Sequence, residues 1–308
     1  MSDVDDLIAA ARRGDRRSIA RLLTAVENGT DEGYKALSRL YADGADSWTV
    51  GVTGAPGSGK STLVDALVAL LRRGGAGVAV LAIDPSSPFT GGALLGDRIR
   101  MQSHAADPGV FVRSMANRGH LGGIAESTPR AVATLAGLGF GEVIIETVGV
   151  GQAEVDVASA VDTTLVVVNP GWGDAVQAAK AGLLEIADVF VVNKADRPGA
   201  DATARELTAM LDVSPPTDWH PPILETVATE PRGVEHVLEA IDDHRSFLAD
   251  GDALAIRRRA QAAASLRAAT ASLLRDTSEQ GADARLIDEV ASRSMDPWTA
   301  ARTLLYGN

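Results

Sequence analysis

One stretch, GVTGAPGSGKSTLVDAL at residues 51–67, constrains the fold more than any other part of the chain. An apolar run leads into a glycine-rich turn, and Lys60, Ser61 and an amphipathic segment follow. The turn matches the pattern G-x-x-x-x-G-K-[ST] at every fixed position. Glycines permit a tight turn whose N–H groups converge on phosphate oxygens, and the following helix adds its positive dipole end. The stretch therefore predicts a phosphate-binding loop between a strand and a helix.

Each position of this loop has an expected role in binding a nucleotide. Lys60 is expected to reach the β- and γ-phosphates and to act in catalysis, and the Ser61 hydroxyl is expected to ligate Mg²⁺. The remaining contacts to the nucleotide are expected from Gly54, Ala55, Pro56, Gly57, Ser58, Gly59 and Thr62. The alternative is a glycine-rich turn that binds no ligand. The strand signal before the turn and the helix signal after it disfavour that alternative.

Short apolar runs rich in β-branched residues recur through the middle of the chain. They lie at 48–54, 77–84, 142–149, 164–170, 189–196 and 221–228. Because these runs are apolar throughout, they are typical of parallel strands covered on both faces. Segments of helical length separate most of them, which predicts βα units in a doubly wound sheet. We expect an α/β fold of the P-loop NTPase class, with a mainly parallel sheet.

Helical periodicity marks both ends of the chain. The apolar residues of 1–47 recur at roughly helical spacing, with an interruption near Gly14. From about residue 246 no further strand is indicated, and the segments that follow carry Leu, Ile and Ala on one face. We therefore expect an N-terminal helical extension over 1–47, a P-loop GTPase domain over 48–245 and a C-terminal helical arm over 246–308.

Composition excludes several classes of protein. The chain has 308 residues and a formal net charge of −12, which argues against a protein that coats nucleic acid or an anionic membrane. It has no cysteine, so disulfides and thiolate metal sites are excluded. No apolar run is long enough to span a membrane, and the acidic start does not resemble a signal peptide. We expect a cytoplasmic protein with neither a membrane nor a nucleic acid as its partner.

The choice of base rests on a second motif. Asn193, Lys194 and Asp196 form N-K-x-D at the end of an apolar run, where the carboxyl ends of parallel strands line a ligand crevice. A carboxylate there accepts hydrogen bonds from guanine N1–H and the N2 amino group, whereas adenine presents neither donor. Each such bond contributes about 1.5–3 kcal/mol, so GTP or GDP is favoured over ATP. A weaker signal is a triad expected to close over the base: Thr226, Val227 and Ala228.

A third motif and its neighbouring segments offer carboxylates that could lie near the nucleotide's phosphates. Glu146 and Gly149 form E-T-V-G, which has the spacing of the D-x-x-G motif of small GTPases. Glu146 is expected to support Mg²⁺ through a water, and the Gly149 N–H to approach the γ-phosphate; a turn-capping Glu146 is the alternative. Asp84 and Asp97 lie in or beside a segment rich in Pro, Ser and Gly. Their spacing leaves open whether either touches Mg²⁺, orients water or caps a turn.

Several longer stretches resemble the MeaB/ArgK family, whose members are GTPases that act as chaperones of adenosylcobalamin-dependent methylmalonyl-CoA mutase. The matching stretches are DPSSPFTGGALLGDRIRM (84–101), FVRSMANRGHLGG (111–123), ETVGVGQAE (146–154), residues 170–196 and MDPWTAARTLL (295–305). The resemblance spans residues 1–308 and implies a G domain between a helical extension and a dimerisation arm, hence a homodimer. It also implies that Asp84, Asp97 and Glu146 are the Mg²⁺-binding and catalytic carboxylates.

The function that this resemblance implies is a Mg²⁺-dependent, GTP-hydrolysing switch. It would bind methylmalonyl-CoA mutase or a related cobalamin mutase and gate the loading and protection of its cofactor. Segment 170–182, with Lys180, resembles a third switch that couples nucleotide state to the mutase. Two alternatives are a metal-insertion GTPase, which usually carries Cys/His clusters, and a small-molecule kinase linked to arginine and ornithine transport. The missing cysteines disfavour the first, and N-K-x-D disfavours ATP as a phosphate donor for the second.

Three features outside the motifs have structural interpretations. Trp48 precedes the first apolar run and is expected to pack in the core. The run Arg257-Arg258-Arg259 is expected to form a solvated helix face or a helix-terminus charge. His220, His236 and His244 show no metal-ligand spacing with one another.

Overall fold

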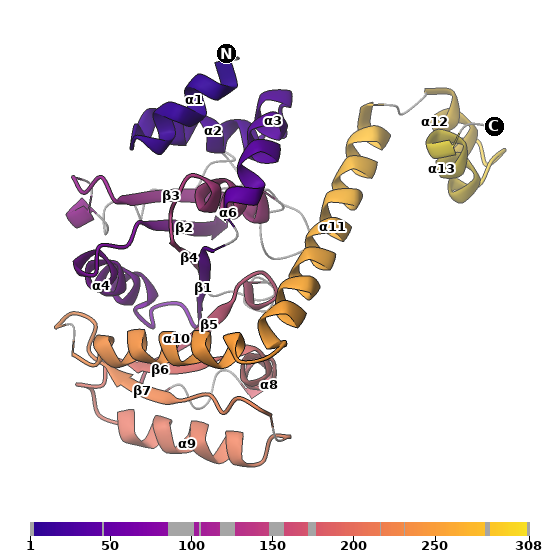
Figure 1. Ribbon diagram of the computed structural model, residues 1–308. Coiled ribbons are helices and arrows are strands. Elements are labelled where there is room, and N and C mark those ends of the chain that lie inside the picture. Colours follow the sequence, from indigo (N-terminus) through magenta and orange to yellow (C-terminus); the bar gives the residue numbers. More distant parts are fainter. Residues whose placement is uncertain are drawn as a thin grey trace. The chain divides into compact units, whose positions relative to one another are not determined.

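The computed structural model describes residues 3–44, 46–85, 102–104, 106–117, 127–147, 157–171, 177–215, 217–230, 232–280 and 284–306. Within these residues the chain forms a seven-stranded sheet with helices packed on it (Figure 1). The chain divides into two compact units, Met1–Arg258 and Arg259–Asn308. The sheet and its helices belong to the first unit. The α/β fold class expected from the sequence, with helical extensions at both ends, is confirmed.

The sheet has the strand order β3-β2-β4-β1-β5-β6-β7, and all its pairings are parallel. The strands are β1 (Trp48–Thr53), β2 (Val78–Pro85), β3 (Val110–Asn117), β4 (Glu142–Thr147), β5 (Thr163–Val168), β6 (Val189–Asn193) and β7 (Ile223–Thr226). The four strands β1, β4, β5 and β6 are buried along their whole length, which explains their continuous apolar character. Because all strands run the same way, their carboxyl ends meet at one edge of the sheet.

Strand β3 is the one that the sequence analysis did not identify. It lies at the end of the sheet order and pairs with β2. Phe111 and Met115 are buried, but Arg113 lies between them and donates to Glu27 at the end of helix α2 (Arg16–Glu27). An edge strand tolerates such polar positions, so the continuous apolar run that marks the central strands is interrupted here.

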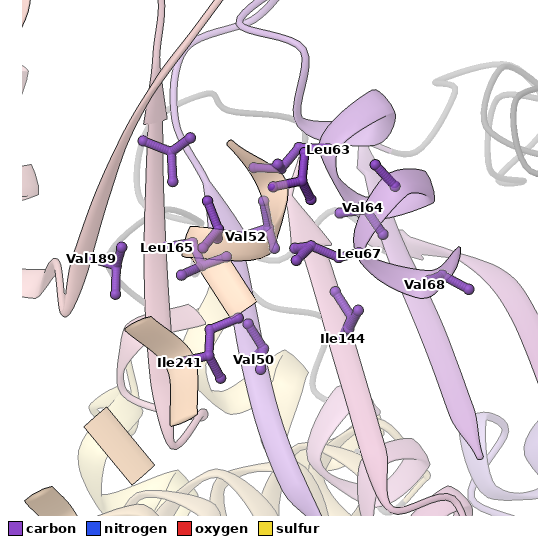
Figure 2. Close-up of a cluster of buried hydrophobic side chains, with 14 of the residues drawn as sticks. Val50, Val52, Leu63, Val64, Leu67, Val68, Ile144, Leu165, Val189 and Ile241 are labelled. Carbon is purple, nitrogen blue, oxygen red and sulfur yellow. The ribbon is translucent and has the colours of Figure 1, made fainter. Parts of the chain in front are cut away.

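Helices α4 (Lys60–Arg73) and α10 (Val234–Ala249) cover one face of the sheet. Val50 and Val52 of β1 point to this face, where Leu63 and Leu67 of α4 and Ile241 of α10 pack against them (Figure 2). These side chains are at least 96% buried, and a fully buried side chain of this size contributes about 1.5–3 kcal/mol. The core therefore fixes α4, and with it the loop that precedes α4.

The opposite face is covered in two halves. Over β2 and β4 lie α1 (Asp3–Arg12), α2, α3 (Asp31–Leu40) and α6 (Thr128–Gly137), while α8 (Gln177–Ile186) and α9 (Ala200–Asp212) cover β5 and β6. The interruption expected near Gly14 is present, since Gly14 has φ 87° between α1 and α2. Asp15 caps α2 by accepting from the Ser18 N–H at 3.0 Å.

The second unit is helical. It contains most of α11 (Ala253–Gln280), together with α12 (Ala284–Ala291) and α13 (Pro297–Tyr306). Asp296 caps α13, accepting from the backbone N–H groups of Trp298 and Thr299 at 3.0 and 3.1 Å. Residue 246, where the C-terminal arm is expected to begin, lies in α10, and the expected domain division stays a prediction. Among the described residues, no helix has the length and apolarity required to cross a lipid bilayer.

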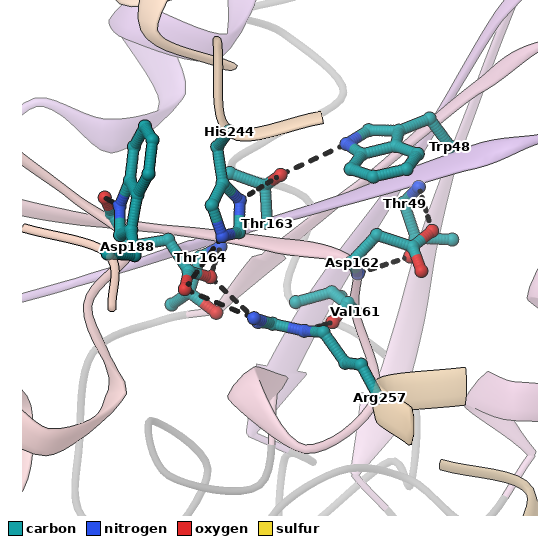
Figure 3. A network of polar contacts seen from close by, with 10 residues as sticks. Trp48, Thr49, Val161, Asp162, Thr163, Thr164, Asp188, His244 and Arg257 are labelled. Atoms are coloured by element: carbon teal, nitrogen blue, oxygen red, sulfur yellow. Dashed lines mark hydrogen bonds and ion pairs between the residues drawn. The ribbon is translucent and has the colours of Figure 1, made fainter. Parts of the chain in front are cut away.

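A network of buried polar side chains lies at the amino-terminal edge of the sheet (Figure 3). Trp48 is 4% exposed, as expected for a core residue, and its Nε1–H donates to Thr163 Oγ1 at 3.0 Å. Thr163 Oγ1 lies 3.0 Å from His244 Nδ1, and His244 Nε2 lies 3.3 Å from Asp188 Oδ1. A neutral ring that accepts at Nδ1 and donates at Nε2 satisfies every contact. Burial, opposed by Asp188, lowers the pKa of His244.

Two arginines of α11 join this edge, so the expectation of a solvated arginine face is wrong for them. Arg257 donates to both carboxylate oxygens of Asp188, at 2.7 and 3.1 Å. Arg258 Nε lies 3.3 Å from Oδ1 of Asp162, whose side chain is 3% exposed. Arg259 is exposed, as expected. The pairs fix the first turns of α11 to the sheet, because a buried carboxylate requires a charged partner.

We predict that His244 makes the fold acid-sensitive. The folded state favours the neutral ring, so the unfolded chain binds a proton more readily below the ordinary pKa of 6.5. The stability contributed by the neutral ring is present above that pH and is lost as the pH falls below it. The expected slope from one such group is at most about 1.4 kcal/mol per pH unit.

The measurement is urea unfolding at a series of pH values from 7.5 to 5. In His244→Gln, the free energy of unfolding is expected to fall less steeply with decreasing pH than in the unaltered chain. His236→Gln, an exposed position on the same helix, is the matched control. Its free energy of unfolding is expected to change with pH as steeply as that of the unaltered chain. Equal slopes for all three proteins contradict the prediction.

Candidate functional site

The predicted phosphate-binding loop lies between β1 and α4, at the carboxyl edge of the sheet. Gly54 has φ 130°, and a Cβ placed on it lies only 2.0 Å from the Val167 carbonyl oxygen. Gly59 has φ 96°, and a Cβ there lies 2.3 Å from Asn193 Nδ2. Both positions therefore require glycine. The first helical residue is Lys60, so the N–H groups of the first turn of α4 face the loop.

The remaining loop positions divide into an exposed rim and a buried floor. Pro56 and Gly57 are exposed, while Ser58 and Lys60 are buried. Lys60 Nζ donates to the carbonyl oxygens of Gly54 and Ala55, at 2.8 and 3.0 Å. These bonds hold the ammonium group over the loop. Thr62, in the first turn of α4, is partly buried.

Two oxygen-bearing side chains meet beside this loop. Ser61 Oγ, in the first turn of α4, donates to Glu146 Oε1 of β4 at 2.6 Å. Glu146 is 5% exposed and Ser61 is 8% exposed. Hydroxyl and carboxylate oxygens are ligands that Mg²⁺ accepts, and Mg²⁺ takes its remaining ligands from phosphates and water. These two residues therefore fit a magnesium site completed by a nucleotide.

Asn193 connects the loop to the far side of the site. It ends β6, is 2% exposed, and its Nδ2 donates to the Ser58 carbonyl oxygen at 2.9 Å. Its Oδ1 accepts from Thr226 Oγ1 at 3.1 Å and from the Ala228 N–H at 3.2 Å. One side-chain amide thus links the loops after β1, β6 and β7. The structure brings these parts of the predicted site together.

The rest of the N-K-x-D motif surrounds Asn193. Lys194 has φ 61°, unusual for a residue other than glycine, and its Nζ donates to the Gly57 carbonyl oxygen at 2.6 Å. Asp196 follows on the surface and is exposed. The Ala195 N–H donates to the Thr226 carbonyl oxygen at 2.9 Å, while Val227 and Ala228 are buried. The carboxylate of Asp196 is therefore available to a ligand at the edge where the loops converge.

Only some of the other predicted residues lie in the part of the chain that the structure describes. Asp84 lies near the end of β2, next to β4 in the sheet, and its side chain is not among those described. Asp97 and Gly149 lie outside the described residues, as do residues 172–176 of the segment expected to form a third switch. Lys180 belongs to α8, which is described for its backbone at that position. Within the described part of the chain, no three acidic or histidine side chains gather as a metal site.

Two residues of this edge were not predicted from the sequence. Thr147 Oγ1 donates to Thr53 Oγ1 at 3.0 Å, and both side chains are at least 99% buried. Thr53 directly precedes Gly54, and Thr147 directly follows Glu146. Their position beside two motifs is the available signal. It is weak, because β-branched threonine is common in strands for packing reasons alone.

Comparison with known proteins decides the family. The model of the family described as "Methylmalonyl Co-A mutase-associated GTPase MeaB" matches residues 19–283. The chain belongs to the MeaB family. A MeaB relative from Pyrococcus horikoshii, whose name describes a GTPase, is 46% identical over 99% of this chain and 98% of its own length. The mitochondrial methylmalonic aciduria type A homolog of Caenorhabditis elegans is 33% identical over 84% of this chain and 70% of its own.

A solved structure extends the match to the fold. The crystal structure of an LAO/AO transport system kinase has a TM-score of 0.74 and 27% identity, covering 99% of this chain and 97% of its own. Together with the P-loop and the family match, it identifies this MeaB-family chain as a P-loop GTPase. Guanine-nucleotide binding follows from membership of a GTPase family.

We predict that Asp196→Asn changes which base is bound. The amide loses both charge-assisted bonds to guanine, so GTP affinity is expected to fall roughly 100-fold or more. Xanthine carries a carbonyl oxygen where guanine carries its N2 amino group, so the variant gains affinity for XTP. Asp201→Asn, an exposed position on α9, is the control. Equilibrium titration with labelled nucleotides measures both effects, and unchanged GTP affinity contradicts the assignment of Asp196.

Proposed function

We propose that this MeaB-family GTPase is a Mg²⁺-dependent switch that binds methylmalonyl-CoA mutase or a related adenosylcobalamin mutase. Its nucleotide state would gate the loading and protection of the mutase's cofactor. The observation that carries the proposal is the family match over residues 19–283, because that family is described as methylmalonyl Co-A mutase-associated. The C. elegans relative, a methylmalonic aciduria type A homolog, supports the same partner class.

The phosphate end of the proposed site is built on α4 and β4. Lys60, held over the loop by two carbonyl oxygens, exchanges them for the β- and γ-phosphates of GTP. Ser61 and Glu146 would hold Mg²⁺, Glu146 through a water, and the ion would neutralise charge that develops on the transferred phosphoryl group. Asp84 and Asp97 would complete the carboxylate set, and the Gly149 N–H would approach the γ-phosphate.

The base end of the proposed site is built on β6 and β7. The Asp196 carboxylate accepts hydrogen bonds from guanine N1–H and the N2 amino group, while Lys194 holds the Gly57 carbonyl oxygen. Thr226, Val227 and Ala228 close over the base from the β7 side. Asn193 is buried, and its side-chain hydrogen bonds hold the loops after β1, β6 and β7 together. The preformed contacts reduce the ordering that nucleotide binding requires.

A switch of this class hydrolyses GTP slowly until a partner completes the site. Arg113 of β3 is an arginine of the sheet, and its guanidinium donates to Glu27 and to the Ala20 carbonyl oxygen on α2. It is therefore held on the N-terminal helices by bonds that a catalytic role would have to break. A partner that completes such a site accelerates hydrolysis by roughly 10³–10⁵-fold.

We also propose that the protein is a homodimer formed through the C-terminal helices. The second unit exposes large apolar side chains that a monomer would leave in water. They are Leu266, Leu273, Leu274, Ile287, Trp298, Leu305 and Tyr306.

A kinase is the second candidate, because a relative of known structure is described as a transport system kinase. A kinase would transfer the γ-phosphoryl group to a small acceptor, whereas a switch transfers it to water. The products separate the two functions directly. Free phosphate alone supports the switch, and a phosphorylated acceptor supports the kinase.

We predict that methylmalonyl-CoA mutase stimulates GTP turnover by at least tenfold. The measurement is phosphate release by the purified protein, alone and with the mutase, with ATP in parallel. Lys60→Ala is the control and is expected to lose turnover under both conditions. Unchanged turnover at saturating mutase, with GTP still bound tightly, contradicts this choice of partner and leaves the GTPase in place.

A further inference from the structure

The backbone ladder between β1 and β4 ends one residue before the loops that follow the two strands. Their ladder runs from Trp48 opposite Glu142 to Val52 opposite Glu146. The next residue of β1, Thr53, pairs with Val166 of β5. The next residue of β4, Thr147, pairs with Ile83 of β2.

A side-chain hydrogen bond joins the next residues of the two strands, Thr53 and Thr147. Thr147 Oγ1 donates to Thr53 Oγ1 at 3.0 Å, and neither side chain is more than 1% exposed. Thr53 enters the phosphate-binding loop, and Ser61, which bonds to Glu146 at 2.6 Å, leaves it. The consecutive residues Glu146 and Thr147 are therefore tied to the two ends of the loop. These two side-chain bonds therefore continue the connection between β4 and the loop beyond the last pair of the backbone ladder.

We infer that Thr53 and Thr147 are positioning residues for GTP hydrolysis. Their bond sets the place of Glu146 relative to the phosphates. Hydrolysis in this class depends mainly on positioning, and a shift of about 1 Å can cost 10²-fold in rate. The inference rests on the proposed function, in which Glu146 and Gly149 serve Mg²⁺ and the γ-phosphate.

The competing explanation is that the two hydroxyls only satisfy each other in the core. The two explanations differ in what a double substitution does. A single valine leaves the other hydroxyl buried without its partner, which destabilises the fold. Valine at both positions removes both polar groups with little change of shape, so stability is expected to recover. A purely structural pair therefore recovers activity together with stability, whereas a positioning pair does not.

The experiment compares full-length Thr53→Val, Thr147→Val, the double variant and Thr147→Ser. Thr164→Val in β5 is the matched control, because the Thr164 hydroxyl is buried without a hydrogen-bond partner among the described residues. Steady-state GTP hydrolysis at saturating Mg²⁺ gives kcat and KM, and urea unfolding gives stability. We expect each valine variant to lower kcat roughly 3- to 10-fold, the worth of one buried hydrogen bond, with KM changed less than about twofold.

The other variants complete the expected pattern. Thr147→Ser keeps the donor and restores kcat, and Thr164→Val leaves kcat and KM unchanged. The double variant regains the stability of the unaltered chain and keeps the lowered kcat. A double variant with restored kcat, or single variants with unchanged kcat, overturns the inference. If the single variants do not fold, the double variant and Thr147→Ser still decide it.

A parallel Glu146→Gln variant separates this inference from the proposed site. If Glu146→Gln loses Mg²⁺-dependent hydrolysis and the threonine variants keep it, only the positioning role is wrong. If Glu146→Gln also hydrolyses GTP normally, the assignment of Glu146 to the Mg²⁺ site is wrong. The positioning role of Thr53 and Thr147 is then wrong as well.

Discussion

The side-chain amide of Asn193 is the contact on which the site depends most. Its nitrogen holds the Ser58 carbonyl oxygen, and its oxygen holds Thr226 and Ala228. A buried amide that ends β6 and bonds both to the loop after β1 and to the end of β7 cannot be replaced by packing alone, because any loss leaves polar groups without partners. One side chain therefore joins the proposed phosphate end of the site to the proposed base end.

The two edges of the sheet have different tasks. The carboxyl edge gathers Lys60, Ser61, Glu146 and Asn193, all on or beside elements fixed by the core. At the amino edge lies the buried polar network of Figure 3, which attaches α10 and the first turns of α11 to the sheet. The ion pairs that attach α11 to the sheet therefore lie at the edge opposite to the proposed nucleotide site.

Local signals in the sequence were sufficient for most of the fold. The glycine-rich turn requires special backbone angles, and the central strands are apolar because both of their faces are covered. Partners distant in the chain were not predictable. Arg257 and Arg258 resembled a solvated face because Asp188 and Asp162 lie 69 and 96 residues earlier. The Thr53–Thr147 bond was missed for the same reason, and β3 was missed because Arg113 interrupts its apolar run.

The most direct test of the proposed site is a crystal structure of the protein with Mg²⁺ and a non-hydrolysable GTP analogue. We expect phosphate density within the loop Gly54–Ser61, the metal beside Ser61 and Glu146, and guanine against Asp196. We also expect the Asn193 and Thr53–Thr147 hydrogen bonds to persist in the complex. A nucleotide bound elsewhere, or a metal held without Ser61 and Glu146, would contradict the proposed site.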